Sequence, residues 1–332
     1  MIKIIERVST SVHEPVALRD AFVTALIHMG EHPDFIYLDA DLMSSVGTRQ
    51  WALAHPDKAF NMGVAEANMI GVAAGLAAAG FRPLVHTFGA FAARRCYDQA
   101  FLAVGYSGFA VTIIGSDPGV TAAFNGGTHM PFEDVALYRA IPGSTVLETT
   151  DAAMLTSVLP QAWQLPGLKY IRVGRKPVLP VYEPENSFQI GQAVCLREGN
   201  DAVIIACGIL VVHALEAAEM LQQEGLTVAV LDCFTIKPLD REAVCHWAEH
   251  TGAVVTAENH NINGGLGSAV AELLSDCRPC PLERIGIYES FGEVGPQDYL
   301  ETRFGLTTLH IADKVRTVMK RKLKCKQGGL TL

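Results

Sequence analysis

The 332-residue chain has few charged side chains and no long apolar run. Charged residues make up 18% and hydrophobic residues 49%, a composition that excludes an intrinsically disordered chain. No stretch approaches the roughly 18 consecutive apolar residues of a membrane-spanning helix, so we expect no membrane partner. The first residues, MIKIIERVST, lack the apolar core of a signal peptide, which makes a cytoplasmic location the expectation. The net charge of −9 argues against nucleic acid as the main partner.

The sequence also lacks the common nucleotide-binding, hydrolase and zinc motifs. It has no G-x-x-x-x-G-K-[ST], no G-x-G-x-x-G between a strand and a helix, and no G-x-S-x-G. Cys277 and Cys280 form one C-x-x-C without the second pair of a zinc ribbon, and His246 and His250 have no third ligand, so no metal site is expected. Other cysteines stand in apolar segments and are expected to be free, buried thiols: Cys96, Cys195, Cys207, Cys233 and Cys245.

Apolar runs of strand length alternate with helix-length segments along the chain. Such alternation is typical of parallel sheets with helices on both faces. The predicted strands span residues 35–39, 83–87, 110–115, 145–148, 169–173, 202–207, 228–231, 254–258 and 282–288. The predicted helices span residues 16–29, 66–79, 90–104, 151–164, 211–224 and 240–250. We therefore predict an α/β protein with two doubly wound open-sheet domains in series.

The alternation stops once, between Lys176 and Gln192. This segment gathers three prolines and two glutamates: Pro177, Pro180, Pro184, Glu183 and Glu185. A polar, proline-rich stretch of this kind is typical of a domain boundary. It predicts an N-terminal domain over residues 1–180 and a C-terminal domain over residues 190–332.

One carboxylate, Glu66, begins a helix that is otherwise almost entirely apolar. From Ala65 to Ala79 the residues are mostly Ala, Gly, Val, Leu and Met, so we expect this helix to be buried on most sides. A buried acid needs a specific reason and can exchange a proton with a ligand. Phe88 and Phe91 follow one helical turn apart, an aromatic shelf that suits a flat heteroaromatic cofactor. The alternative is a helix start at which Glu66 only complements the macrodipole.

Further polar residues follow the predicted strands of the N-terminal domain. Asp39 and Asp41 come after the first strand, and the segment from Asp117 to His129 follows the third. Ligands of open α/β sheets bind at the carboxyl ends of the strands. The C-terminal domain has the glycine-rich loop ENHNINGGLG but no comparable set of ionisable residues. We therefore expect the chemistry to belong to the N-terminal domain.

Several segments of the chain occur in the same order as similar segments of one enzyme family. RDAFVTAL, LDADL, NMGVAEANMIGVAAGLAAAG, TFGAFAARRCYDQ, GGTHMPFEDVALYRAIPG and YIRVGR resemble the C-terminal half of transketolase, and more closely the separate small subunit of split transketolases. VIIACG, GLTVAVLDCFTIKPLD, VVTAENHNINGGLGSAV and SFGEVG resemble the final domain of that family. The resemblance spans about residues 16–318.

The resemblance implies a thiamine-diphosphate enzyme with a pyrimidine-binding domain and a transketolase C-terminal domain. Such an enzyme transfers a two-carbon ketol unit from a ketose or its phosphate to an aldose or its phosphate. Glu66 matches the glutamate that hydrogen-bonds the aminopyrimidine ring and shares a proton with it. Phe88 and Phe91 match the aromatics lining the pyrimidine pocket. Asp41 matches a position near the cofactor, or it only caps the segment that follows.

The substrate residues also follow from the resemblance. His129 matches a histidine that points at the reacting end of the donor, the alternative being a polar loop histidine. Arg19, Ser45 and Arg175 match positions that hold the sugar phosphate, a task that suits the planar guanidinium of arginine. The alternative for Arg19 is a helix surface charge, and for Arg175 a linker charge.

Three residues depart from the family pattern. The segment SDPGVTAAFNGGTH has Asp117 in place of a phosphate-side histidine and Asn125 in place of an acid that binds a sugar hydroxyl. Arg94 stands where some full-length transketolases have a tyrosine. An anion at position 117 would repel a phosphate. We therefore hypothesise a sugar or sugar phosphate outside the usual pentose-phosphate set.

The thiamine-enzyme motif G-D-G, which holds Mg²⁺ and the diphosphate, is missing from the chain. We therefore expect a partner, an N-terminal transketolase subunit with the G-D-G motif, in an A2B2 assembly. Two alternatives stay open. The chain could be the β subunit of a 2-oxoacid dehydrogenase, a relative with the same domain pair that releases carbon dioxide. It could also be a non-catalytic regulatory subunit, against which Glu66 and His129 argue.

Overall fold

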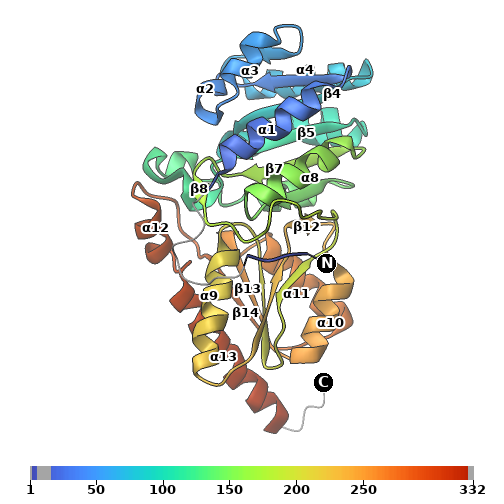
Figure 1. Cartoon of the computed structure of the whole chain (residues 1–332). Coiled ribbons are helices and arrows are strands. Elements are labelled where there is room, and N and C mark those ends of the chain that lie inside the picture. Colours follow the sequence, from blue (N-terminus) through green and yellow to red (C-terminus); the bar gives the residue numbers. More distant parts are fainter. Residues whose placement is uncertain (1, 6–15, 328–332) are drawn as a thin grey trace.

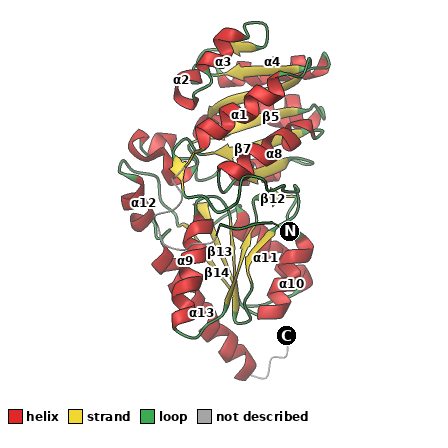
Figure 2. Cartoon of the chain, viewed as in Figure 1, coloured by secondary structure: helices red, strands yellow, loops and turns green. Residues whose placement is uncertain are grey.

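The computed structural model describes residues 2–5 and 16–327, and consists of two α/β bodies joined end to end. Figure 1 shows the N-terminal body above and the C-terminal body below, each with a central sheet and helices packed on it. Figure 2 shows strands in the middle of both bodies and helices outside them. The predicted fold class of two α/β domains in series is confirmed. Among the described residues, no helix is both long and apolar enough to cross a membrane.

The N-terminal body is built on a seven-stranded sheet with the order β12-β6-β7-β5-β4-β2-β3. All neighbours are parallel except β12, which runs antiparallel to β6. The strands are β2 (Phe35–Asp39), β3 (Ala59–Asn61), β4 (Arg82–Phe88), β5 (Val111–Ser116), β6 (Thr145–Glu148), β7 (Leu168–Val173) and β12 (Thr235–Lys237). Strands β2, β5, β6 and β7 are buried along their whole length, as expected for a sheet with helices on both faces.

Helices and short turns cover this sheet. The α-helices are α1 (Leu18–Gly30), α2 (Met43–Val46), α3 (Arg49–Ala54), α4 (Glu66–Ala78), α5 (Gly89–Arg94), α6 (Tyr97–Gln99), α7 (Asp134–Ala140) and α8 (Ala152–Gln164). A π-helical segment, η1 (Ala100–Tyr106), and two 3-10 turns, η2 (Gly119–Asn125) and η3 (Gly127–His129), complete the body.

The C-terminal body is built on a five-stranded sheet with the order β14-β13-β10-β11-β9, in which only β9 is antiparallel to its neighbour. Its strands are β9 (Val194–Arg197), β10 (Ala202–Ala206), β11 (Val228–Asp232), β13 (Val254–Asn261) and β14 (Leu282–Ile287). Its helices are α9 (Leu210–Gln223), α10 (Arg241–Thr251), α11 (Leu266–Cys277), α12 (Gln297–Arg303) and α13 (Thr308–Gln327).

The two bodies are connected by more strand pairing across the predicted boundary than the sequence indicates. Strand β12 lies beyond the predicted boundary but pairs with β6, so it extends the N-terminal sheet. In the predicted linker, β8 (Pro177–Val178) pairs with β1 (Val16–Ala17), which leads into α1. The domain division at residues 180–190 stays a prediction.

Two expectations about helices are wrong. The single helix expected over residues 90–104 is three elements, because Cys96, with φ of −135°, separates α5 from α6 and η1. Helix α4 is buried on one face only, through residues such as Met69 and Ala73. Its other face, which includes Gly71 and Val72, is exposed among the residues that the structure describes.

The cysteine prediction is also corrected. Cys245 and Cys277 form a disulfide that joins α10 to α11, so Cys245 is no free thiol and Cys277 does not pair with Cys280. Cys195 is exposed. Partners 32 residues apart on different helices leave no local spacing that a sequence pattern can reveal.

Candidate functional site

Glu66 is the first residue of α4 and is only 3% exposed. It faces the end of β4, where the Thr87 hydroxyl donates a hydrogen bond of 3.2 Å to Oε1. Arg95, just after α5, approaches from the other side, with Nη1 at 3.2 Å from Oε1 and 3.4 Å from Oε2. The carboxylate is therefore buried, fixed in position, and satisfied by one hydroxyl and one cation.

An aromatic cluster lies beside Glu66. Phe88 ends β4 and Phe91 follows in α5, with ring centroids 6.0 Å apart. The His129 ring packs edge-on against both, at 5.6 Å from Phe88 and 5.0 Å from Phe91. The Arg95 guanidinium lies over Phe91, with Cζ at 3.7 Å from the ring centroid. His129 comes from η3, so two loops at the carboxyl edge of the sheet meet here.

Arg175 and Asp117 lie next to this aromatic cluster, beside Phe88. The Arg175 guanidinium lies 5.1 Å from the Phe88 ring centroid, and its Nε donates to Asp117 Oδ1 at 2.7 Å. Asp117 follows β5 in a left-handed conformation, with φ of 57°, and its side chain is buried. The two residues therefore form an ion pair at the edge of the aromatic cluster, and Arg175 presents a partly neutralised charge.

The other candidate residues lie outside the aromatic cluster and the neighbouring ion pair. Arg19, on α1, is exposed and pairs with Asp20 at 3.6 Å. Asp41 is exposed and accepts a hydrogen bond of 2.8 Å from Asn61. Within the described residues, no hydrogen bond, ion pair or ring contact joins these two, Ser45 of α2 or the exposed Asn125 of η2 to the aromatic cluster.

Below the site, a buried polar cluster that the sequence analysis missed lies where the two bodies meet. Arg172 of β7 donates through Nε to Asp134 Oδ2 at 2.8 Å and through Nη1 to Glu148 Oε2 at 3.0 Å. Its Nη1 also donates to the Asn259 carbonyl of β13 at 2.9 Å. Arg172 and Asp134 are buried completely at the side chain. The cluster therefore joins ionisable side chains of the N-terminal body to the backbone of the C-terminal body, and the expectation that the chemistry belongs to the N-terminal domain stays a prediction.

Burial and charge shift the pKa values of this cluster in opposite directions. Burial alone would raise the pKa of Asp134, but the charge and hydrogen bonds of Arg172, together with His260 and the Tyr170 hydroxyl, outweigh it and the pKa is lowered. Burial raises the pKa of Glu258, within β13, to about 7, although the Gly267 and Leu266 N–H groups donate hydrogen bonds to its carboxylate. Burial and Arg172 lower the pKa of His260 to about 4, so this histidine is neutral near pH 7.

Asn259 also fixes the loop that leads to the candidate substrate residues. Its Oδ1 accepts from the Val120 N–H at 3.0 Å and its Nδ2 donates to the Pro118 carbonyl at 2.9 Å. A second contact follows at Gly127, where an added Cβ would lie 2.1 Å from the Gly292 carbonyl oxygen. Only glycine permits this close approach, so the C-terminal body contacts both ends of the segment from Pro118 to Gly127, which leads into His129.

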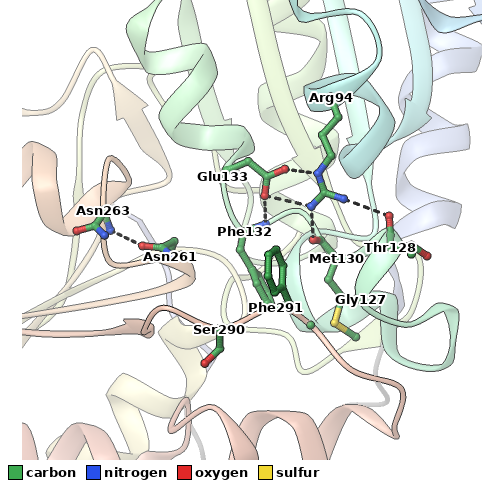
Figure 3. Close-up of a pocket in the computed structure, with 11 residues that line it drawn as sticks. Arg94, Gly127, Thr128, Met130, Phe132, Glu133, Asn261, Asn263, Ser290 and Phe291 are labelled. Atoms are coloured by element: carbon green, nitrogen blue, oxygen red, sulfur yellow. Dashed lines mark hydrogen bonds and ion pairs between the residues drawn. The ribbon is translucent and has the colours of Figure 1, made fainter.

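A cavity of about 820 Å³ opens beside this segment, between the two bodies. Figure 3 shows Arg94 in it, paired with Glu133 and donating to the carbonyls of Thr128 and Met130. Arg94 therefore anchors the two neighbours of His129. The cavity is lined from the N-terminal body by Arg94, Gly127, Thr128, Met130, Phe132 and Glu133, and from the C-terminal body by Asn261, Asn263, Ser290, Phe291 and Gly292.

Family models match both parts of the chain. The transketolase pyrimidine-binding domain matches residues 14–178, and the transketolase C-terminal domain matches residues 191–311. The chain belongs to the transketolase family. Enzymes of this family depend on thiamine diphosphate.

Individual members of the transketolase family resemble the chain over nearly all its length. A 6-deoxy-6-sulfo-D-fructose transketolase subunit, SqwH of Clostridium sp. (strain MSTE9), is 49% identical over 92% of this chain and 95% of its own. A subunit of the apulose-4-phosphate transketolase of Phocaeicola vulgatus is 34% identical over 88% of this chain and 94% of its own. A solved split-gene transketolase, described as an inactive beta4 tetramer, has a TM-score of 0.86 and 39% identity over 93% of this chain and all of its own.

The transketolase site fits one half of thiamine diphosphate. Glu66 offers a buried carboxylate to the N–H edge of an aminopyrimidine, and Phe91 offers a flat apolar face beside it. The described residues offer no comparable set of ligands to a magnesium diphosphate. Within residues 2–5 and 16–327, no group of three or more His, Cys, Asp or Glu is placed to hold a metal ion.

The Arg172 cluster predicts a large loss of stability on truncation. Arg172→Met should lower the free energy of unfolding by about 3–5 kcal/mol, because Asp134 and Glu148 would remain buried without their cation. Urea denaturation followed by circular dichroism measures the change. The matched control is Arg316→Met, which removes a surface pair with Glu224 and should have a much smaller effect. Equal effects of the two substitutions would show that the cluster does not hold the bodies together.

Proposed function

We propose that this chain is the catalytic pyrimidine-binding subunit of a two-component transketolase, active with a partner subunit that carries the diphosphate and Mg²⁺ site in an A2B2 assembly. The observation that supports the proposal is that buried Glu66 and the ring of Phe91 are both contacted by one side chain, Arg95, at the carboxyl edge of the sheet. The domain layout, with a pyrimidine-binding domain to about residue 180 and a C-terminal domain from about residue 190, belongs to the same proposal.

Each residue of the proposed site has its own role. Glu66 holds a proton between its carboxylate and the aminopyrimidine, and Thr87 fixes Oε1 for that task. Phe88 and Phe91 orient the ring and exclude water. When bound, thiamine diphosphate supplies the electron sink for breaking and re-forming the carbon–carbon bond. The Thr128 hydroxyl lies 2.9 Å from Nδ1 of His129, which leaves Nε2 for a sugar hydroxyl.

The remaining candidate residues keep their proposed roles at the substrate entrance. Arg175 and Asp117 would face the distal end of the sugar, next to Phe88. Arg19, Ser45 and Asn125 would complete the substrate site, and Asp41 would lie near the cofactor. The exposure of Arg19, Asp41 and Asn125 in this chain is consistent with contacts that form only when a partner subunit covers the edge of the sheet.

We propose a ketose with a terminal sulfonate as the donor. A phosphate monoester carries a charge of about −1.5 to −2 at pH 7, whereas a sulfonate carries a single charge. Asp117 neutralises much of the Arg175 charge, which disfavours the more highly charged group. SqwH, which its name describes as acting on 6-deoxy-6-sulfo-D-fructose, supports the same class of substrate.

Glu66→Gln tests the catalytic proposal. In the assembled enzyme we expect ketol transfer to fall by at least about 100-fold, because glutamine cannot hold the proton. Assembly should be unchanged by size-exclusion chromatography with light scattering. Glu249→Gln, an exposed change on α10, serves as the control and should keep full activity. Full activity of Glu66→Gln would refute the mechanism, and carbon dioxide release by the wild type would instead indicate a 2-oxoacid dehydrogenase.

The donor proposal is tested by comparing sulfonated and phosphorylated ketoses. For the wild-type complex, kcat/KM should be highest with a 6-sulfonated ketose. Asp117→Asn should raise kcat/KM for a phosphorylated donor relative to the sulfonated one by at least about threefold, since an anion near the distal group is removed. A wild-type preference for xylulose 5-phosphate, with a ratio that Asp117→Asn leaves unchanged, would contradict the donor assignment.

A further inference from the structure

Arg95 is absent from the expected set of functional residues, yet it touches both groups proposed to hold the pyrimidine. It follows Phe91 by four residues, a spacing that places the two side chains on one helix face. Its guanidinium lies flat enough on Phe91 to bring Cζ to 3.7 Å from the ring centroid. From there Nη1 reaches both oxygens of Glu66.

A guanidinium in this position resembles an aminopyrimidine in three respects. It is planar, it stacks on an aromatic face, and it directs N–H groups at a carboxylate. We propose that Arg95 competes with the aminopyrimidine for its subsite on Glu66 and Phe91 and has to leave that subsite when thiamine diphosphate binds. The inference rests on the proposed function, since it concerns the same cofactor site.

The contacts of Arg95 are those of a side chain that a ligand can displace. Its side chain is 46% exposed, whereas that of Glu66 is 2% exposed. Its two hydrogen bonds, at 3.2 and 3.4 Å, are long for a charge-assisted pair. A half-exposed ion pair of this length adds little stability, so a ligand can displace it.

The same contacts give Arg95 a function in the empty site. Without it, the buried Glu66 carboxylate would keep, among the described residues, only its hydrogen bond with the Thr87 hydroxyl. Burying a carboxylate without a compensating charge is unfavourable. Arg95 therefore holds Glu66 in place before the cofactor arrives and competes with the cofactor for the same oxygens. Competition of this kind lowers the apparent affinity by the fraction of molecules in which the subsite is free.

The test is the affinity of the assembled enzyme for thiamine diphosphate, measured by isothermal titration calorimetry with excess magnesium. Arg95→Ala should bind the cofactor about fivefold more tightly than the wild type, equivalent to about 1 kcal/mol. Arg95→Lys, which keeps the charge but not the planar stack, should fall between the two. Arg303→Ala is the matched control, because Arg303 also lies over a phenylalanine, Phe304, and pairs with a glutamate, Glu293, away from the site. It should leave the affinity unchanged.

The outcomes separate this inference from the proposed function. No binding to the wild-type complex would refute the proposed function itself. Binding to the wild type that Arg95→Ala leaves unchanged or weakens would overturn the displacement of Arg95 alone. A thermal-unfolding cycle on the chain without cofactor, with Arg95→Ala, Glu66→Gln and the double variant, checks the contact independently. The two positions should be coupled there, and additive shifts in Tm would also count against the inference.

Discussion

The hydrogen bonds of Arg172 are the interaction on which the site depends. One buried guanidinium joins β7 to Asp134 at the start of α7, to Glu148 on β6 and to the Asn259 carbonyl on β13. Asn259 in turn holds the Pro118–Val120 loop. The position of the loop with His129 is therefore set by packing between the two bodies. This coupling explains why a C-terminal body that contributes none of the proposed pyrimidine contacts still shapes the site.

The second constraint follows from the proposed function, in which the chain carries only part of a cofactor site. Glu66, Phe88 and Phe91 suit the flat, hydrogen-bonding end of thiamine diphosphate, and nothing comparable among the described residues suits its magnesium diphosphate. The exposed apolar face of α4, next to Glu66, is consistent with a surface that another subunit covers. A carboxylate held by Arg95 until a ligand arrives fits a site that is completed only on assembly.

Apolar periodicity was sufficient to predict the central strands of both sheets and the helices α1, α4, α8, α9 and α10, because parallel strands are buried on both faces and repeat between amphipathic helices. It also located the buried acid Glu66 and the aromatic pair. Apolar periodicity could not predict contacts between distant segments. Strand β12 pairs with a strand of the N-terminal sheet, Cys245 forms a disulfide with Cys277, and Asn259 accepts a hydrogen bond from Val120. Arg95 was missed for a different reason, since its spacing from Phe91 was visible but an arginine at a helix end is usually a surface charge.

Calorimetric titration of thiamine diphosphate in the presence of magnesium tests the central claim, that this chain supplies half of a shared site. The cofactor would be added separately to this chain, to a partner subunit that carries the G-D-G motif, and to their equimolar mixture. The account predicts tight binding only in the mixture, with one cofactor for each pair of subunits. Tight stoichiometric binding to this chain alone would contradict it.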